Sequence, residues 1–423
     1  MKRSIVTGFV LVGSLFMMDL HAERLTLQET LSQSLQHYPQ LRATALKVAQ
    51  SKSAYRSAYA DYLPQVNLTA QYNGVQTFVF PVNGAFHTVD DQGWSATVAL
   101  KQKVWDFSQT KLRVHAKKVD ETIAKLSLEE AKAQLAYRVK SLYATMVLQQ
   151  EAIDVRKADL RTKEAYYKQA QALLKEGLKT KADTARLRSA LFVAKESLES
   201  AKSAYNKARK SLELYMGSSI DPAVELDHSV LKQQLQVQKK RLYAALEQQN
   251  YTLAIERKNI EKNRLLKEAA KASHYGSVDL VASYSHLDTL NAYDAKVAGV
   301  TLNIPLYTGG RLQAEAKKAA LSTQIAQEER ASLDLSLKEE LTNLLLDIEH
   351  YGVTIAAKKA LIVSAKETEA VMQGRYAQGL ATYIELLDAD TLLLDANLGL
   401  LEAYYQRALA LYRIDYLKGI YNE

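Results

Sequence analysis

The chain has 423 residues, no cysteine and a formal net charge of +8, so disulfides, thiolate catalysis and sulfur-rich metal sites are excluded. Glycine (16) and proline (5) are scarce, which is typical of long helices rather than of the two or three globular domains that the length would otherwise suggest. Lysines and arginines are scattered among acidic residues without a clustered basic stripe, so we expect no nucleic-acid partner.

The N-terminus has the pattern of a secretory signal peptide. Lys2 and Arg3 precede an apolar run over 5–18, and Leu20-His21-Ala22 follows. This run is too short to span a membrane as a helix, so we expect residues 1–22 to be removed on export. An exported chain without cysteine fits the periplasm or a location beyond it.

Helical patterns fill most of the mature chain, interrupted at Pro39, Pro64, Gly177 and Gly379. We predict helices over 25–38, 40–62, 110–175, 182–216, 242–273, 311–377 and 384–418. At about 1.5 Å per residue, the helix over 311–377 is roughly 100 Å long, which matches the two shorter helices of its copy placed end to end.

Two strand pairs interrupt the helices. Each strand alternates apolar and polar residues, the pattern of a sheet with one apolar face. The apolar positions are Val66, Leu68, Ala70 and Tyr72, then Trp94, Ala96, Val98 and Leu100, then Val278, Leu280, Ala282 and Tyr284, then Ala298, Val300, Leu302 and Ile304. The offset between copies falls from 212 to 202 residues, so we expect the first hairpin loop, roughly 73–93, to be about ten residues longer than the second.

The chain is internally duplicated. The segment from Gly177 to Gly217 recurs 202 residues later, from Gly379 to Gly419, with apolar positions that step by four and three. These positions are Leu187, Leu191, Ala194, Leu198, Ala201, Tyr205, Ala208, Leu212 and Tyr215, and then Ala389, Leu393, Ala396, Leu400, Ala403, Arg407, Ala410, Ile414 and Leu417. Only Arg407 breaks the series, which predicts helices packed as coiled coils.

The strands point to an oligomeric pore. Each is long enough to cross a bilayer when tilted, and an open sheet is not viable in lipid because its edge groups lack partners. Four strands cannot close a barrel, since bacterial barrels begin at about eight. Two, three or four copies would each suffice, so the number stays open at this point.

Aromatic residues lie at the ends of the alternating runs, where interfacial aromatics sit in membrane barrels. They are Tyr72, Trp94, Trp105, Tyr284 and Tyr307. Alternatively, they reflect only the general preference of strands for aromatic side chains.

These patterns predict a mainly α protein with membrane β-structure. We divide it into a signal peptide (1–22), N-terminal periplasmic helices (23–64), a transmembrane β-hairpin (65–107), a periplasmic helical hairpin (108–217), an equatorial linker (218–240), a periplasmic helix (241–275), a second transmembrane β-hairpin (276–307), a second helical hairpin (308–419) and a C-terminal tail (420–423).

Several short motifs carry a family resemblance, and they occur in a fixed order. They are Leu25-Thr26-Leu27-Gln28-Glu29, Tyr38-Pro39-Gln40-Leu41, Tyr62-Leu63-Pro64, Ile304-Pro305-Leu306-Tyr307-Thr308-Gly309-Gly310, Tyr376-Ala377-Gln378-Gly379-Leu380 and Leu386-Leu387-Asp388-Ala389. With the duplication, they make the chain resemble the outer membrane efflux protein family, the TolC-like exit ducts. The resemblance implies a homotrimer with a 12-stranded barrel continued by a 12-helix periplasmic tunnel. It also implies docking, through a periplasmic adaptor (membrane fusion) protein, to an inner-membrane efflux pump or ABC transporter.

The resemblance also implies functional residues at the far tips of the helical hairpins. Gly177, Leu178, Gly379 and Leu380 match the positions that contact the adaptor. Alternatively, the two glycines serve only as helix C-caps.

The periplasmic entrance is the second implied site. Asp183 and Tyr376 match the pair whose hydrogen bond holds the entrance shut, and Glu385 and Asp388 match the carboxylates that ring the constriction. Three-fold symmetry would turn each acid into a ring that favours cations, although an acid beside a helix start also simply complements the helix dipole. This chain has Ala381 where well-studied members have an arginine, so we expect the gate to be held either by fewer contacts or differently, for example through Lys179 or Lys181.

We therefore predict a passive exit duct in the outer membrane of a double-membraned bacterium, for drugs, metal ions or proteins. The alternative is a periplasmic coiled-coil scaffold or adaptor without a pore. An enzyme is not expected, because the eight histidines show no metal-ligand spacing and no nucleophile motif stands out. No cofactor and no resident metal are expected either.

Overall fold

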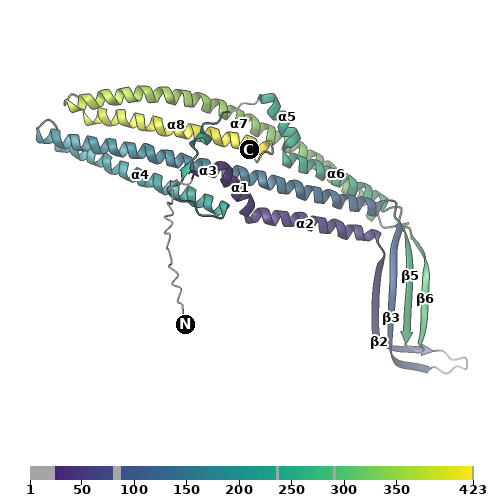
Figure 1. Cartoon of the computed structure of the whole chain (residues 1–423). Helices are drawn as coiled ribbons and strands as arrows, with labels where there is room; N and C mark the ends of the chain where they lie inside the picture. The colour runs from purple at the N-terminus through teal and green to yellow at the C-terminus, as the bar shows by residue number, and fades with distance from the viewer. Residues whose placement is uncertain (1–23, 80–86, 235–237, 289–291, 422–423) are drawn as a thin grey trace, which may run out of the picture.

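A computed structural model describes residues 24–79, 87–234, 238–288 and 292–421. The predicted signal peptide lies outside these residues. The protein is elongated and mainly helical, with a four-stranded sheet that extends from one end of a long helical bundle (Figure 1).

Eight α-helices make up the bundle in the described part of the chain. They are α1 (Leu27–His37), α2 (Pro39–Tyr59), α3 (Gln109–Lys175), α4 (Lys181–Met216), α5 (Lys239–Gln249), α6 (Tyr251–Ala272), α7 (Arg311–Ala377) and α8 (Tyr383–Leu417). Helices α3 and α7 have 67 residues each, and their predicted lengths are confirmed. Helix α3 forms a hairpin with α4 and α7 forms one with α8, while α2 and α6 flank the half of the bundle nearer the sheet (Figure 1).

The apolar positions predicted to step by four and three form the buried packing face, or seam, of α4 and α8, the second helix of each hairpin. In α4 the buried members are Leu187, Ala194, Leu198, Tyr205, Ala208 and Leu212. In α8 they are Ala389, Ala396, Ala403, Arg407, Ala410, Ile414 and Leu417. Arg407 is buried as well, so the one polar position belongs to the seam rather than interrupting it.

One predicted helix is in fact two. The expectation of a single helix over 242–273 is wrong, because α5 and α6 meet at a break at Asn250. Asn250 has φ −63° and ψ 122°, nearly the values of Tyr38 between α1 and α2, which has φ −65° and ψ 118°. The two residues are 212 positions apart, so the break repeats an element of the first copy.

Four antiparallel strands form the main sheet in the order β2-β3-β5-β6. They are β2 (Gln65–Val79), β3 (His87–Trp105), β5 (Ser277–Asp288) and β6 (Ala292–Asn303). The predicted long loop over 73–93 is wrong, because pairing between β2 and β3 continues from Asn73↔Gly93 to Val79↔His87. The additional residues of the first hairpin lengthen its strands, and only 80–86 lie outside the described residues.

A second, two-stranded sheet joins the N-terminal segment to the linker. Strand β1 (Arg24–Leu25) pairs in parallel with β4 (Glu225–Leu226). The Tyr143 hydroxyl of α3 donates to Leu25 O at 2.7 Å and accepts from the Asp227 amide at 2.8 Å. Burial raises the pKa of Tyr143 to about 12, so the hydroxyl stays a neutral donor.

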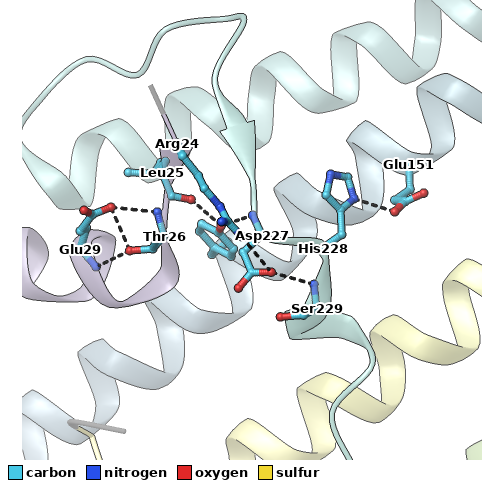
Figure 2. Close-up of polar contacts among 9 residues, drawn as sticks. Arg24, Leu25, Thr26, Glu29, Glu151, Asp227, His228 and Ser229 are labelled. Carbon is cyan, nitrogen blue, oxygen red and sulfur yellow. Dashed lines mark hydrogen bonds and ion pairs between the residues drawn. The ribbon is translucent and has the colours of Figure 1, made fainter. Parts of the chain in front are cut away.

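The linker is attached to α3 at a further point close to this sheet. His228 Nδ1 lies 2.6 Å from Glu151 Oε1, and the Asp227 carboxylate accepts from the Ser229 amide at 3.0 Å (Figure 2). These contacts fix the short 3₁₀ helix His228–Leu231 against the middle of the bundle.

Within the described ranges, no helix combines the length and the apolar character needed to cross a membrane.

Candidate functional site

The hairpin tips are tight glycine turns. Gly177 has φ +73°, and the Leu178 amide donates to Leu173 O at 2.9 Å. Gly379 (φ +75°) and Leu380 repeat this geometry in the second copy. A left-handed residue followed by this hydrogen bond closes a helix C-terminus, so the glycines do act as C-caps. Leu178 and Leu380 are 58% and 65% exposed, which leaves two apolar side chains at the tips.

Helices α4 and α8 both begin with a capping box. The Asp183 carboxylate accepts from the Thr180 amide at 2.8 Å and from its hydroxyl at 2.9 Å. Glu385 accepts from Thr382 in the same way, at 2.7 and 2.9 Å. The backbone hydrogen bond from Thr382 is the main reason that the pKa of Glu385 is lowered. Asp388 is exposed on the same helix.

Tyr376 lies at the centre of a small apolar core where the two hairpin tips meet. Its side chain is fully buried, and within the described part of the chain its hydroxyl has no hydrogen-bond partner. Burial, and to a lesser degree the charge of Asp183, raises the pKa of Tyr376. The other buried members of this tip core are Tyr166, Ala170, Leu173, Leu187, Ala381 and Leu386. A hydrogen bond between Asp183 and Tyr376 is not among the contacts of the described residues.

Lys179 lies next to Ala381. Its ammonium donates to Ala381 O at 2.7 Å and lies 4.8 Å from the centre of the Tyr376 ring. Lys179 therefore contacts both Tyr376 and Ala381, the position where the family resemblance implies an arginine. Lys181, the other lysine considered from the sequence, is exposed at the start of α4.

The sequence interpretation missed a buried ionic cluster just beyond the tip core. Lys163 of α3 forms an ion pair with Asp390 of α8 and lies 3.5 Å from Asp159 of its own helix. The Tyr166 hydroxyl donates to Glu369 Oε1 of α7 at 2.9 Å. Burial raises the pKa of Asp390, and Lys163 opposes this effect.

A signal for this cluster does exist in the sequence. Asp159, Lys163, Tyr166, Ala170 and Leu173 step by four and three, so the two charged residues continue the buried seam of α3. Charged residues at seam positions are costly unless they are paired across the interface. Extending the seam analysis from α4 and α8 to α3 would have identified them.

The main sheet has two chemically different faces. Apolar side chains on one face are strongly exposed, and the most exposed are Val66 (62%), Leu68 (72%), Tyr72 (68%), Val300 (68%) and Leu302 (63%). The opposite face carries polar contacts, for example Thr97 Oγ1 to Ser285 Oγ at 2.9 Å and Lys101 to Asp279 at 3.6 Å. An apolar face of this size needs an apolar environment.

A β-bulge places Trp105 on the apolar face. The register of β3 against β5 shifts between Lys103, which pairs with Asp279, and Trp105, which pairs with Val278. Directly paired residues point to the same face, so without the bulge Trp105 would lie on the polar face with Lys101 and Lys103. Re-aiming a side chain is a typical effect of a bulge.

The other predicted interfacial aromatics occupy several positions along the sheet. Tyr72 pairs with Trp94, near the far end of β5, and Tyr307 follows β6 at the helical end with 90% exposure. Tyr284 is paired with Lys296 inside β5 rather than at its end.

Known proteins resemble this chain over most of its length. The family model described as outer membrane efflux protein matches residues 30–218 and 229–419. Outer membrane protein TolC of Escherichia coli is 24% identical over 407 residues, which cover 91% of this chain and 80% of that protein. The alkaline protease secretion protein AprF of Pseudomonas aeruginosa is 22% identical over 360 residues, or 79% of this chain and 71% of that protein.

Solved structures share the fold. The outer membrane protein VceC from Vibrio cholerae superposes with a TM-score of 0.82 at 17% identity, covering 94% of this chain and 97% of that one. A structure of CusC, from work on transmembrane channel formation, gives a TM-score of 0.83 at 18% identity and covers 93% of this chain and 92% of that one.

Proposed function

Because the chain belongs to the outer membrane efflux protein family, we propose that it is the exit duct of a tripartite efflux or type I secretion system. Its place is the outer membrane, with a large periplasmic portion. In this proposal substrate passes from an inner-membrane pump through a periplasmic tunnel and leaves without chemical change. The names of the relatives include both efflux and protease secretion, so the class of substrate stays open.

The exposed apolar face of the sheet is the observation that carries the proposal. Strands β2 and β6 are the edges of the sheet, and an edge cannot stay unpaired in lipid. The four strands alternate in direction, so β6 of one copy can pair antiparallel with β2 of the next without breaking the alternation. Three copies would then close a barrel of twelve strands through the hairpins 65–107 and 276–307.

The dimensions of β3 support a membrane-spanning role. Trp94 and Trp105 lie on its apolar face eleven positions apart, which is about 36 Å along a strand. At a tilt of about 40°, the two rings would be separated by roughly 28 Å along the membrane normal, close to the hydrocarbon thickness of a bilayer.

The periplasmic roles follow the hairpins 108–217 and 308–419. We assign Asp183, Tyr376 and Lys179 to a gate at the entrance, where the Tyr376 hydroxyl still needs a polar partner that a neighbouring copy could supply. Glu385 and Asp388 would form rings of carboxylates there, and the exposed Leu178 and Leu380 would contact the adaptor. A capping role and a pore role are compatible, because a capping carboxylate keeps its charge.

The test is purification from outer membranes followed by recording in planar bilayers. We expect detergent-resistant trimers and discrete conductance steps. A monomer or a soluble rod that gives no conductance would overturn the proposal and favour a periplasmic coiled-coil scaffold or adaptor.

A further inference from the structure

Arg407, the one charged residue of the α8 seam, is buried without an acidic partner among the described residues. It is 7% exposed. One of its terminal nitrogens donates to Lys232 O at 3.3 Å, while its Nε has no acceptor in the described part of the chain. Burial lowers the pKa of Arg407, whereas a nearby carboxylate would raise it. A buried charge and a buried unpaired donor are both costly, so Arg407 is suited to bind an anion.

Arg413, six residues further along α8, has such a partner. Its guanidinium forms an ion pair with Glu340 of α7. Burial acts to lower the pKa of Arg413, but the hydrogen bond and the charge of Glu340 raise it overall. The same pair of helices therefore supplies a carboxylate to one arginine and none to the other.

Arg407 lines a groove between α7, α8 and the linker. The groove has a volume of about 420 Å³, and its lining contains a second cation, Lys359 of α7. Both cations lie against one aromatic ring, with Arg407 Cζ 5.4 Å and Lys359 Nζ 5.7 Å from the centre of Tyr404. None of the other described residues that line the groove is acidic: they are Gln234, Ile348, Gly352, Ile355 and Ala356.

The first copy of the duplication has an acid where the second copy has none. Lys359 lies 202 positions after Lys157, whose ammonium pairs with Asp154 at 3.0 Å. The position that matches Asp154 in the second copy is Ala356. The second copy thus keeps the lysine but not the carboxylate three residues before it.

Two further differences between the copies enlarge the groove and add a charge to it. Gly352 stands where the first copy has Gln150, and Arg407 stands where the first copy has Tyr205. A glycine in the interior of a helix is destabilising relative to alanine, and a Cβ at Gly352 would meet no atom within 4 Å. The glycine is therefore not required by close packing, and its effect is to leave open space beside the two cations.

We infer that Arg407 and Lys359 form an anion-binding site for a carboxylate or phosphate group. A guanidinium binds both of these groups through paired, charge-assisted hydrogen bonds, and an ammonium adds a second positive charge. Two sources of such a group fit the site, a small anion and an acidic side chain of a second copy of this chain. The inference goes beyond the proposed function, because binding of a small anion does not require a pore.

The first test titrates inorganic phosphate into the mature protein, in a neutral detergent at constant ionic strength, and follows thermal unfolding. A ligand that binds only the folded state raises the melting temperature. We expect phosphate to stabilise the wild type, and Arg407→Gln to bind it about tenfold or more weakly, because hydrogen bonds to charged groups contribute more than neutral ones. Arg413→Gln is the matched control and should keep the wild-type response, since Arg413 already pairs with Glu340.

Ala356→Asp tests the site with Arg407 in place, in case Arg407→Gln folds poorly. The new carboxylate has the spacing to Lys359 that Asp154 has to Lys157, so it supplies an anion from within the groove. We expect this variant to melt at a higher temperature than the wild type without phosphate and to respond little to phosphate. Ala357→Asp, an exposed neighbour that does not line the groove, should keep the wild-type response.

The second test distinguishes an acidic side chain of another copy from a small anion. With that source, phosphate leaves the wild type unchanged, and detergent-resistant oligomers of Arg407→Gln dissociate at a lower temperature than those of Arg413→Gln. Arg407→Lys should recover part of this loss, because it keeps the charge but not the paired donors.

Two results overturn the anion site. One is a wild type that does not respond to phosphate and whose oligomers are no more stable than those of Arg407→Gln. The other is a phosphate response that persists unchanged in Arg407→Gln or Ala356→Asp, because the phosphate then binds elsewhere. Failure of the exit duct is a separate result, since a wild type without conductance can still be titrated with phosphate.

Discussion

The carboxylates of Asp183 and Glu385 each accept two hydrogen bonds from the threonine that begins their helix. A carboxylate in this position stabilises the helix start by capping and by its interaction with the helix dipole. Its charge persists, so it can still act on ions or on a neighbouring copy. Capping explains the residue type at both positions, and a gating role needs a separate test.

Asp183→Ala and Thr180→Ala separate these two roles. Both substitutions destroy the same capping box, at a cost of about 1 kcal/mol each, but only the first removes the carboxylate beside Tyr376. If Asp183 is a gate residue, Asp183→Ala raises single-channel conductance and Thr180→Ala does not. Equal conductance in the two variants, measured in planar bilayers, would assign Asp183 to capping alone.

At the scale of elements, the duplication repeats helix breaks as well as helices. The break between α1 and α2 is dictated by Pro39, whereas its counterpart at Asn250 lacks a proline. Side-chain hydrogen bonds of Asn250 take the place of the proline. Its Oδ1 accepts from the Leu253 amide at 3.0 Å, and its Nδ2 donates to Leu417 O at 3.0 Å. One buried side chain thus caps α6 and satisfies the end of α8.

Asn250→Ala should destabilise this junction by about 2 kcal/mol, since it removes an N-cap and leaves a buried carbonyl without a partner. Thermal unfolding of the detergent-solubilised protein is the measurement. Asn250→Ser keeps a neutral capping acceptor but is too short to donate to Leu417 O, so we expect an intermediate loss. A melting temperature unchanged in both variants would show that the break does not depend on this side chain.

For the whole molecule, the decisive feature is the contrast between the two faces of the sheet. Alternation in the sequence identified both faces, and the register confirms that apolar residues of all four strands share one of them. In the proposed barrel the apolar face would meet lipid and the polar face would line the interior.

Val300→Lys tests this assignment. Val300 lies in the middle of the apolar run of β6 and is 68% exposed, and a lysine on the lipid face near the bilayer centre costs about 2–4 kcal/mol. We expect loss of trimers from the outer membrane fraction. Thr301→Lys, the neighbour on the polar face, should be recovered like the wild type. Similar recovery of both variants would contradict a lipid-facing apolar side.

The sequence by itself determined most of the elements, because periodicity, proline and glycine act locally, and its ordered motifs indicated the family. The 67-residue helices, the capped tips and the alternating strands all follow from neighbours within a few positions. The break at Asn250 could also have been inferred from the duplication, because the first copy has a break at the matching position, although the second copy has no proline there.

Only the tertiary structure decided which distant residues meet. Lys163 and Asp390 are 227 positions apart, and the seam pattern of α3 indicates that Lys163 is buried but not which residue pairs with it. The bulge that turns Trp105 to the apolar face and the strand pairing that replaces the expected loop also depend on a partner strand. Burial and pairing are properties of surfaces brought together by folding, and no local pattern specifies the partner.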